Sequence, residues 1–322
     1  MGRFGSLQYW QRRRAHKRMP RLRNAPSMKE ALLTNLVAYK AGMTHLTMID
    51  DTEGPAKNQE VARACTVLEV PRMEVYGIRM YGAEGGTKYR KTRTEFYSKA
   101  AAQKLGIKNL KNDESKLEQA KGKLADYTDI SALIVAYPKD VSSVEQHHPM
   151  RFESRVGGST VQEKFDYVSK LLGKEVKMND IFKPGEFIDV STVTTGKGWA
   201  GVIKRHGVHR NAHKATNKIR HGGPLGSFGD GRIFFTVPRA GQMGFNYRTE
   251  HNKRILKIGQ KADTEQINQR GGFQDYGVVK NDFVVVDGSI GGTTKRLVRI
   301  RKSIRERNAT GIKEPRVLFI AK

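Results

Sequence analysis

The chain of 322 residues is strongly basic: 59 lysines and arginines stand against 32 acidic side chains, and the formal net charge is +27. Its single cysteine, Cys65, excludes an intrachain disulfide and a thiolate zinc site, which suits a reducing cytosol. No apolar run approaches the roughly 18–20 residues needed to cross a bilayer, so no membrane partner is expected.

The excess charge is confined to three segments. Residues 1–29 hold nine Lys or Arg and no acid, residues 196–257 hold 13 against two acids, and residues 295–316 hold nine against two. The remainder is balanced, and 37% of the chain is hydrophobic, enough for a substantial core. A neutral body with three cationic appendages is typical of nucleic-acid-binding proteins.

The composition of residues 1–29 predicts a basic N-terminal extension that has no hydrophobic core of its own. Tyr9 and Trp10 precede a run of three arginines, and four more cations follow closely. Such an arm is either a disordered solubilising tail or a segment that orders on RNA. In the second case its cations would contact phosphates, and the aromatic pair would stack on a base or pack on the body.

Residues 30–93 predict the first part of a small β-barrel or sandwich. Short apolar runs at 32–39, 43–50, 61–70 and 73–82 are separated by Gly, Pro and Asp residues. This spacing is typical of successive antiparallel strands joined by turns.

Residues 94–177 predict an α/β insertion within the β domain. Apolar residues show helical spacing over 94–125, beginning at Phe96, and SALIVAYP (131–138) indicates a buried strand. A second helix is expected over 159–172, where a Ser-Thr pair can cap its first turn.

The sequence of residues 178–205 again predicts barrel strands. Residues 258–322 are expected to form the closing barrel strands and a basic C-terminal segment. Between them, residues 206–257 predict a basic, Gly-rich central extension and its return. In KRLVRIRKSI (295–304), charged and apolar residues alternate. One face of this strand would therefore sit on the core while the other faces a partner.

Gly196, Gly198 and Gly201 form a G-x-G-x-x-G pattern after an expected strand. A dinucleotide site would also need an amphipathic helix and an acidic residue about 20 positions later. The sequence has no acid between Asp189 and Asp230. These glycines are better explained as positions where the backbone closely approaches phosphates or another strand.

His206, His209 and His213 are spaced three and four residues apart, as metal ligands can be. The lysines and arginines between them oppose a dication, and no carboxylates support them, so RNA contacts are favoured over a metal. Neither a nucleophile elbow nor a phosphate-binding P-loop motif occurs. We therefore expect no enzyme activity, cofactor, metal or small-molecule substrate.

Residues 222–231 (GGPLGSFGDG) place five glycines and a proline around one aromatic, Phe228. In a free protein this would be a mobile hairpin tip, but between basic strands it indicates a finger threaded into folded RNA. The residues expected to contact RNA are Arg3, Trp10, Arg12, Arg13, Arg14, Lys17, Arg18, Arg21, Arg23, Lys197, Lys204, Arg205, His206, His209, Arg210, His213, Lys214, Lys218, Arg220, His221, Phe228, Arg232, Arg239, Gln242, Arg248, Lys253, Arg254, Lys295, Arg296, Arg299 and Arg301.

Several separated motifs resemble one known family. The motifs resemble, in the family's order, those of the universal large-subunit ribosomal protein three family. They are TNLVAYKAGMTH (34–45), TVTTGKGWAGVIKRHG (192–207), GGPLGSFGDGRIFFTVPRAGQMGFNYRTEHNKRILKIG (222–259) and GTTKRLVR (292–299). The long N-terminal arm and the 94–177 insertion resemble its archaeal/eukaryotic branch.

This resemblance implies a mainly β fold with an α/β insertion: a translation-protein-type β-barrel with long N-terminal and central extensions that penetrate RNA. It implies a structural, cytoplasmic protein that binds 23S-type rRNA near its 3′ end, helps nucleate subunit assembly and buttresses the peptidyl-transferase region. The implied neighbours are large-subunit proteins fourteen and twenty-four-e. Phe228 matches a fingertip position where many members carry Trp, so stacking is kept but the indole N–H donor is lost. His213 falls near a histidine that is methylated in some eukaryotic members.

Two other classes of function fit part of the sequence. An architectural DNA-binding protein would use basic helices or intercalating wedges on a compact module, and it would leave the Gly-rich finger unexplained. A non-ribosomal RNA-binding or RNA-modifying factor would, if catalytic, need a cofactor loop or a catalytic acid among the cations.

Overall fold

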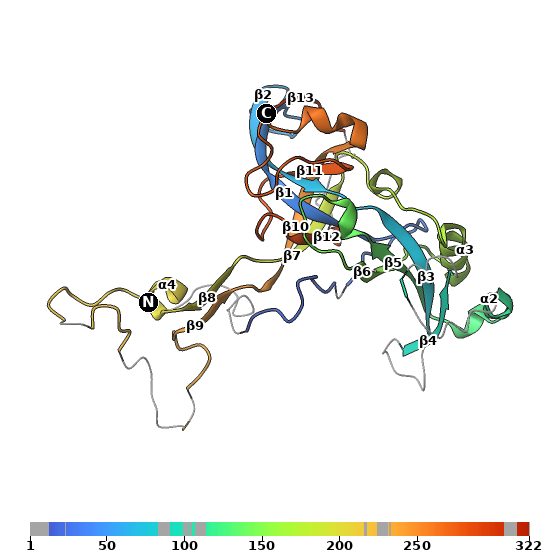
Figure 1. The fold of residues 1–322 in the computed structure, drawn as a ribbon, viewed down its shortest axis with the longest axis horizontal. Coiled ribbons are helices and arrows are strands. Elements are labelled where there is room, and N and C mark those ends of the chain that lie inside the picture. The colour runs from blue at the N-terminus through green and yellow to red at the C-terminus, as the bar shows by residue number, and fades with distance from the viewer. Residues whose placement is uncertain are drawn as a thin grey trace.

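The body is a closed antiparallel β-barrel with a second sheet packed beside it and a long ribbon projecting from it (Figure 1). The computed structural model describes residues 13–22, 24–82, 91–98, 103, 105–106, 114–215, 218–223, 231, 233–305 and 314–321. The barrel strands are β1 (Asn35–Ile49), β2 (Glu60–Glu69), β7 (Phe187–Val193), β10 (Tyr247–Gly259), β11 (Phe283–Asp287) and β12 (Leu297–Lys302), with β13 (Val317–Ile320) added at the side.

The strand order β12-β7-β10-β11-β2-β1 closes on itself because β1 also pairs with β12, with Ala38 opposite Val298. β1 is long enough to serve two partners along one edge: its first part pairs with β12 and its last part with β13, while β2 pairs along its other edge. A register shift between Lys40 and Gly42 lets it bend between them. Gly42 is required there, since a Cβ would lie 2.6 Å from the Phe273 ring. The β-barrel predicted from the sequence is confirmed.

The second sheet has the order β4-β3-β5-β6 and is antiparallel throughout. Its strands are β3 (Met73–Gly82), β4 (Lys91–Tyr97), β5 (Asp129–Ala136) and β6 (Met150–Arg155). Helix α3 (Val161–Leu171) covers it with buried Phe165 and Val168, and it begins at a capping box formed by Thr160 and Glu163. This helix lies where the sequence predicted one.

Two details of this region differ from the sequence-based expectation. Residues 73–82 were expected in the barrel, but they form β3, the second strand of the other sheet. The strand is buried on both faces, and such an apolar run fits the middle of either sheet, so its composition does not say which one it joins. Phe96 was expected at the start of a helix and instead lies in β4, opposite Ile78 of β3.

The remaining elements are short. They are the helices α2 (Glu114–Gly122) and α4 (Val202–His206), the ribbon strands β8 (Gly196–Ala200) and β9 (Gly241–Gly244), and the 3-10 turns η2 (Leu124–Asp126), η3 (Pro138–Asp140), η4 (Met178–Asp180) and η5 (Lys261–Gln266).

One hydrophobic core joins the barrel to the second sheet. It runs from Leu36, Val285 and Ile300 in the barrel to Ile134 and Phe165 under the second sheet. The two sheets therefore act as one rigid mount for the ribbon. Among the residues that the structure describes, no helix is both long and apolar enough to span a membrane.

Candidate nucleic-acid interface

The projecting ribbon is a direct continuation of two barrel strands. Strand β7 pairs with β10 as far as Val193 and Tyr247, and the next residues, Thr194 and Asn246, exchange further hydrogen bonds. Pairing then continues into β8 and β9 (Figure 1). Because the hydrogen-bonded ladder runs on from the barrel wall, the ribbon leaves the body in a fixed direction.

The base of the ribbon depends on Gly244. This residue has φ +73, and a Cβ on it would lie 2.1 Å from the Thr195 carbonyl oxygen, so any side chain would separate the two strands. Beyond the strands, Arg205 at the end of α4 ties the two arms together. Its Nε donates to the Gln242 carbonyl at 3.2 Å, and its Nη1 donates to the Arg239 carbonyl at 2.8 Å.

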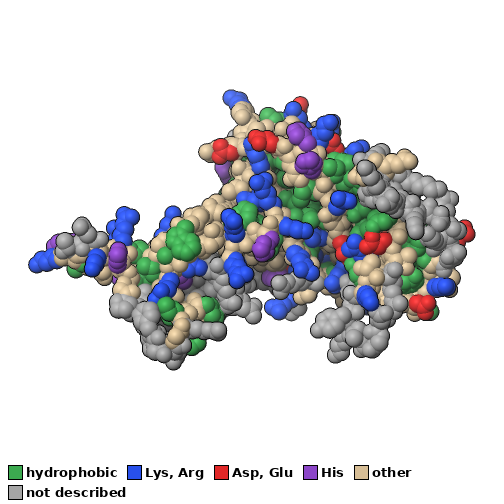
Figure 2. Space-filling view, turned by 60° about the horizontal axis from the view of Figure 1, so that its bottom comes forward, with side chains coloured by type: hydrophobic (Ala, Val, Ile, Leu, Met, Phe, Trp, Pro, Cys, Tyr) green, Lys and Arg blue, Asp and Glu red, His purple; other side chains and the backbone are tan. Residues whose placement is uncertain are grey.

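The outer part of the ribbon is cationic and exposed. The described residues between 196 and 246 include no Asp or Glu. Figure 2 shows Lys and Arg side chains along the projection, whereas the Asp and Glu side chains in that view lie on the body. The predicted contact residues exposed here are Lys197, Lys204, His209, Arg210, His213, Lys214, Lys218, Arg220, His221 and Arg239. His206 is half-buried in α4.

Aromatic side chains accompany these cations. Trp199 in β8 is 78% exposed, and Phe234 and Phe235 on the returning arm are 65% and 53% exposed. Tyr247 at the ribbon base is also exposed. Large apolar rings with this exposure beside cations suit base stacking. These aromatics were not among the residues predicted to contact RNA; the signal that could have found them is their position in a segment with 13 cations and two acids.

The N-terminal arm docks at the ribbon base. The Ala15 N–H donates to the Phe245 carbonyl at 2.7 Å, and the Asn246 side chain donates to the Arg13 carbonyl at 2.7 Å. The Tyr247 hydroxyl accepts from the Lys17 N–H and donates to the Lys17 carbonyl. These contacts bring exposed predicted residues of the arm to the foot of the ribbon, namely Arg13, Arg14, Lys17 and Arg18, with Arg21 following. Two cationic segments that are far apart in the sequence thus form one surface.

Arg299 and Arg301 differ from the sequence-based expectation. We expected the charged face of β12 to meet an external partner, but both side chains are buried and bonded within the protein. Arg299 donates to the Asn35 side chain and to the Glu153 carbonyl, each at 2.7 Å, and to the Pro20 carbonyl at 3.3 Å. The strand does alternate as predicted, but its cationic face is covered by the chain's own N-terminal arm. Burial lowers the pKa of Arg299 to about 10, so it stays charged at neutral pH.

Other predicted contact residues are also engaged inside the protein. Arg254 forms a two-pronged ion pair with Asp51 across the barrel, and hydrogen bonding to that carboxylate raises its pKa. Lys253 pairs with Glu250 at 3.4 Å. The amide of Gln242 donates to the Met243 and Gly244 carbonyls. These side chains stabilise the mount of the ribbon.

The remaining predicted residues divide into two sets. Arg248 is half-buried beside the ribbon base, Lys295 is exposed, and Arg296 lies over the Phe245 ring at 5.2 Å. The predicted residues Arg3, Trp10, Arg12, Arg23, Phe228 and Arg232 lie outside the described residues. Within the described part of the chain, no three His, Cys, Asp or Glu side chains come together in an arrangement that could hold a metal ion.

Comparison with known proteins covers nearly the whole chain. A family model described as ribosomal protein L3 matches residues 1–319. The chain is 38% identical over 329 residues to the large ribosomal subunit protein uL3 of Methanothermobacter thermautotrophicus, an alignment that covers 99% of this chain and 96% of that protein. It is 40% identical over 327 residues to the uL3 protein of Methanococcus vannielii, with coverage of 99% and 96%. It is also 40% identical over 313 residues to that of Methanobrevibacter smithii, with coverage of 95% and 92%.

Proposed function

This chain belongs to the ribosomal protein L3 family, and we propose that it is a structural component of the large ribosomal subunit that holds folded rRNA through its ribbon and N-terminal arm. The barrel and the second sheet are the mount, and the cationic surface formed by the two extensions is the RNA-binding part. The observation that carries the proposal is the joining of this surface at the ribbon base, where Asn246 and Tyr247 bond the backbone of the arm.

The chemistry of this surface suits a polyanion better than a protein. Exposed Lys and Arg side chains without interspersed acids repel one another until phosphates neutralise them. Exposed rings such as Trp199 and Phe234 offer stacking faces to unpaired bases. Recognition on the ribbon is therefore chiefly of RNA shape, since phosphate contacts fix position without reading sequence.

We extend the proposal to the place of binding and the role in assembly. The chain binds 23S-type rRNA near its 3′ end, helps nucleate subunit assembly and buttresses the peptidyl-transferase region from a distance through RNA geometry. Large-subunit proteins fourteen and twenty-four-e are its proposed neighbours. In this role the chain acts on no substrate and needs no cofactor.

A ribbon deletion tests the proposal. Residues 207–238 are replaced by a short Gly-Ser linker, which leaves β8, α4, Arg205 and β9 in place. We expect affinity for transcribed large-subunit rRNA to fall sharply. The slope of log K against log salt should also fall by about 0.7–0.9 for each phosphate contact removed. Thermal unfolding of the barrel should stay cooperative and unchanged. Unchanged rRNA affinity and salt slope would contradict the proposal.

A competition experiment with duplex DNA distinguishes the proposed rRNA-binding function from that of an architectural DNA-binding protein. An architectural DNA-binding protein would prefer duplex DNA of matched length at equal salt, whereas we expect folded large-subunit rRNA to displace DNA from the full chain. Because both ligands are polyanions, the comparison is made over a range of salt concentrations.

A further inference from the structure

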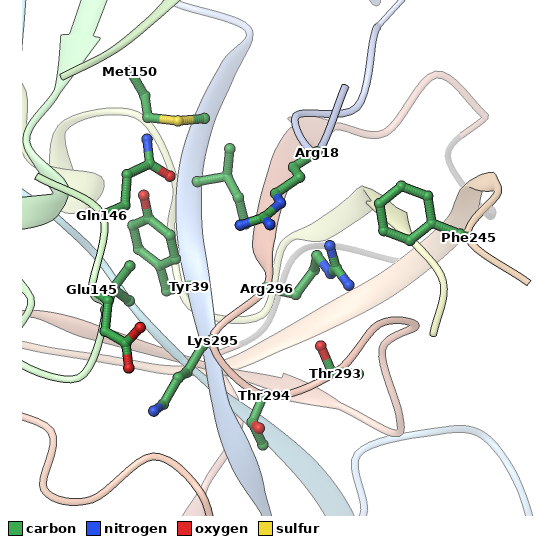
Figure 3. Close-up of a pocket in the computed structure, with 12 residues that line it drawn as sticks. Arg18, Tyr39, Glu145, Gln146, Met150, Phe245, Thr293, Thr294, Lys295 and Arg296 are labelled. Atoms are coloured by element: carbon green, nitrogen blue, oxygen red, sulfur yellow. The ribbon is translucent and has the colours of Figure 1, made fainter. Parts of the chain in front are cut away.

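A groove of about 690 Å³ lies where four parts of the chain meet. The N-terminal arm contributes Arg18, strand β1 contributes Tyr39, the loop before β6 contributes Gln146, and the ribbon base contributes Phe245. The loop before β12 and the first residue of that strand close it with residues 293–297. Figure 3 shows the guanidinium groups of two arginines in the middle of the groove, between Phe245 on one side and Tyr39 and Gln146 on the other. The volume falls in the range of sites that hold small ligands.

Three cations line this groove. Within the described residues, Arg18, Lys295 and Arg296 form no salt bridge, and the Arg296 Nε is buried without a hydrogen-bond partner. Burial, and then the charge of Arg18, lower the pKa of Arg296, so the two arginines are close enough to repel each other. The acid in the lining is Glu145, which is exposed. An anion between the cations would relieve this repulsion.

The backbone of the groove is strained at two positions. Five described residues other than glycine have positive φ, and three of them are Asn or Asp, which tolerate this conformation. The other two are Phe245, with φ +56, and Lys295, with φ +62, and both line the groove. Residues forced into the left-handed region cluster at ligand-binding positions. The Phe245 ring centroid lies 5.2 Å from the central guanidinium carbon of Arg296, within the range of a cation–π contact.

The end of the groove opposite Phe245 carries an unused polar group. The Tyr39 side chain is only 2% exposed, and its hydroxyl has no hydrogen-bond partner among the described residues. Gln146, which is half-buried, also lines the groove and is drawn on the Tyr39 side of it in Figure 3. A buried hydroxyl without a partner costs the protein free energy, and a ligand that supplied a partner would recover that free energy.

We propose that the groove clamps one unpaired nucleotide of the rRNA, with its phosphate between Arg18, Lys295 and Arg296 and its base towards Tyr39 and Gln146. This inference rests on the proposed function and refines it. Guanidinium forks hold phosphate oxygens in two-pronged contacts, and an unpaired base presents hydrogen-bonding edges to the polar end. The ribbon recognises RNA shape, whereas the groove would select a single position where the strand leaves the helix.

The test uses the full chain and transcribed large-subunit rRNA, with 2′-hydroxyl acylation probing at single-nucleotide resolution. Lys295→Gly deletes a groove cation and suits the left-handed backbone, so it does not threaten folding. Arg296→Lys keeps the charge but removes the fork. The matched control is Arg270→Lys at an exposed position outside the groove. We expect each groove variant to bind rRNA several-fold to about tenfold more weakly. One or two unpaired nucleotides protected by the wild type should become reactive, and the control should change nothing.

The outcomes separate this proposal from the function on which it rests. If the groove variants leave affinity and every protected nucleotide unchanged while the wild type binds rRNA, the nucleotide clamp is wrong and the proposed function stands. If the wild type itself does not bind rRNA, the proposed function fails. Titration with the four nucleoside monophosphates and inorganic phosphate, followed by NMR of Tyr39, tests the source of the ligand. Binding of free nucleotides with no change in rRNA protection would overturn the assignment to rRNA. In the assembled subunit, crosslinking from the groove to a protein in place of RNA would also overturn it.

Discussion

The Arg301 Nη2 lies 2.6 Å from the Asp189 Oδ2 in the barrel wall, and both side chains are buried. Asp189 also accepts the Asn252 N–H at 3.2 Å and lies 3.0 Å from the His251 Nδ1. Arg301 in turn donates to the Asn24 carbonyl at 2.8 Å. This pair therefore joins β7 and β12 to each other and to the N-terminal arm.

We predict that Asp189→Asn destabilises the protein by about 3–5 kcal/mol, because it leaves the Arg301 charge buried without a counter-charge. Urea unfolding followed by circular dichroism measures the change. The matched control is Glu175→Gln, which breaks the exposed pair with Arg72 at 3.3 Å and should cost less than about 1 kcal/mol. Similar costs for the two variants would contradict the structural role assigned to Asp189.

The same carboxylate predicts a dependence of stability on pH. Burial raises the pKa of Asp189, but hydrogen bonds from Arg301, the Asn252 N–H and His251 outweigh it, and the pKa lies below its ordinary value. A lowered pKa in the folded state stabilises the fold above the unfolded value of about 3.9, and this stability is lost as pH falls through the folded pKa. The free energy of unfolding should therefore drop below about pH 4, and less steeply in Asp189→Asn. Asp50 and Asp51, whose pKa values are also lowered, leave a residual slope.

The sequence predicts the barrel and the ribbon because their signals are local. Alternating strands and Gly-rich turns mark the barrel, and a segment with 13 cations and two acids marks the ribbon. It does not predict the burial of Arg299, because the alternation of β12 shows only that two faces differ. What covers the charged face is set by contacts to Pro20 and Glu153, which are distant in sequence.

The sequence does not predict the groove either, because the groove also depends on contacts between residues that are distant in sequence. Arg18, Lys295 and Arg296 were predicted to contact RNA, but nothing local indicates that they converge from opposite ends of the chain. The left-handed conformations of Phe245 and Lys295 are imposed by tertiary structure on residue types that disfavour them. The unpartnered hydroxyl of Tyr39 is likewise invisible until the strands are assembled.

Arg299 gives a prediction about the N-terminal arm. Arg299→Met removes the donor to the Pro20 carbonyl and leaves the Asn35 side chain and the Glu153 carbonyl without their charged partner. We expect a loss of about 2–4 kcal/mol in the free energy of unfolding and faster tryptic cleavage at Arg18 and Arg21 under native conditions. Mass spectrometry of a digestion time course measures the cleavage. Arg270→Met, an exposed control, should leave the arm as protected as in the wild type.

Gly244 allows the ribbon to be disrupted without harm to the barrel. In Gly244→Ala the new Cβ meets the Thr195 carbonyl oxygen, so β8 and β9 must separate at the base, at a local cost of about 1–3 kcal/mol. We expect faster amide hydrogen exchange at Trp199 and weaker rRNA binding. Gly201→Ala is the control, because Gly201 has φ −67 and a Cβ there meets nothing within 4 Å.

Cys65 reports on the barrel in the same samples. It is the chain's single cysteine, lies buried in β2, and burial raises the pKa of its thiol to about 12, so alkylating reagents reach it as a reactive thiolate only after unfolding. Its labelling rate should be equal in the wild type, Gly244→Ala and Gly201→Ala. Faster labelling in Gly244→Ala alone would mean that ribbon and barrel unfold together, and the continuous ladder from β7 into β8 would then be part of the barrel's own stability.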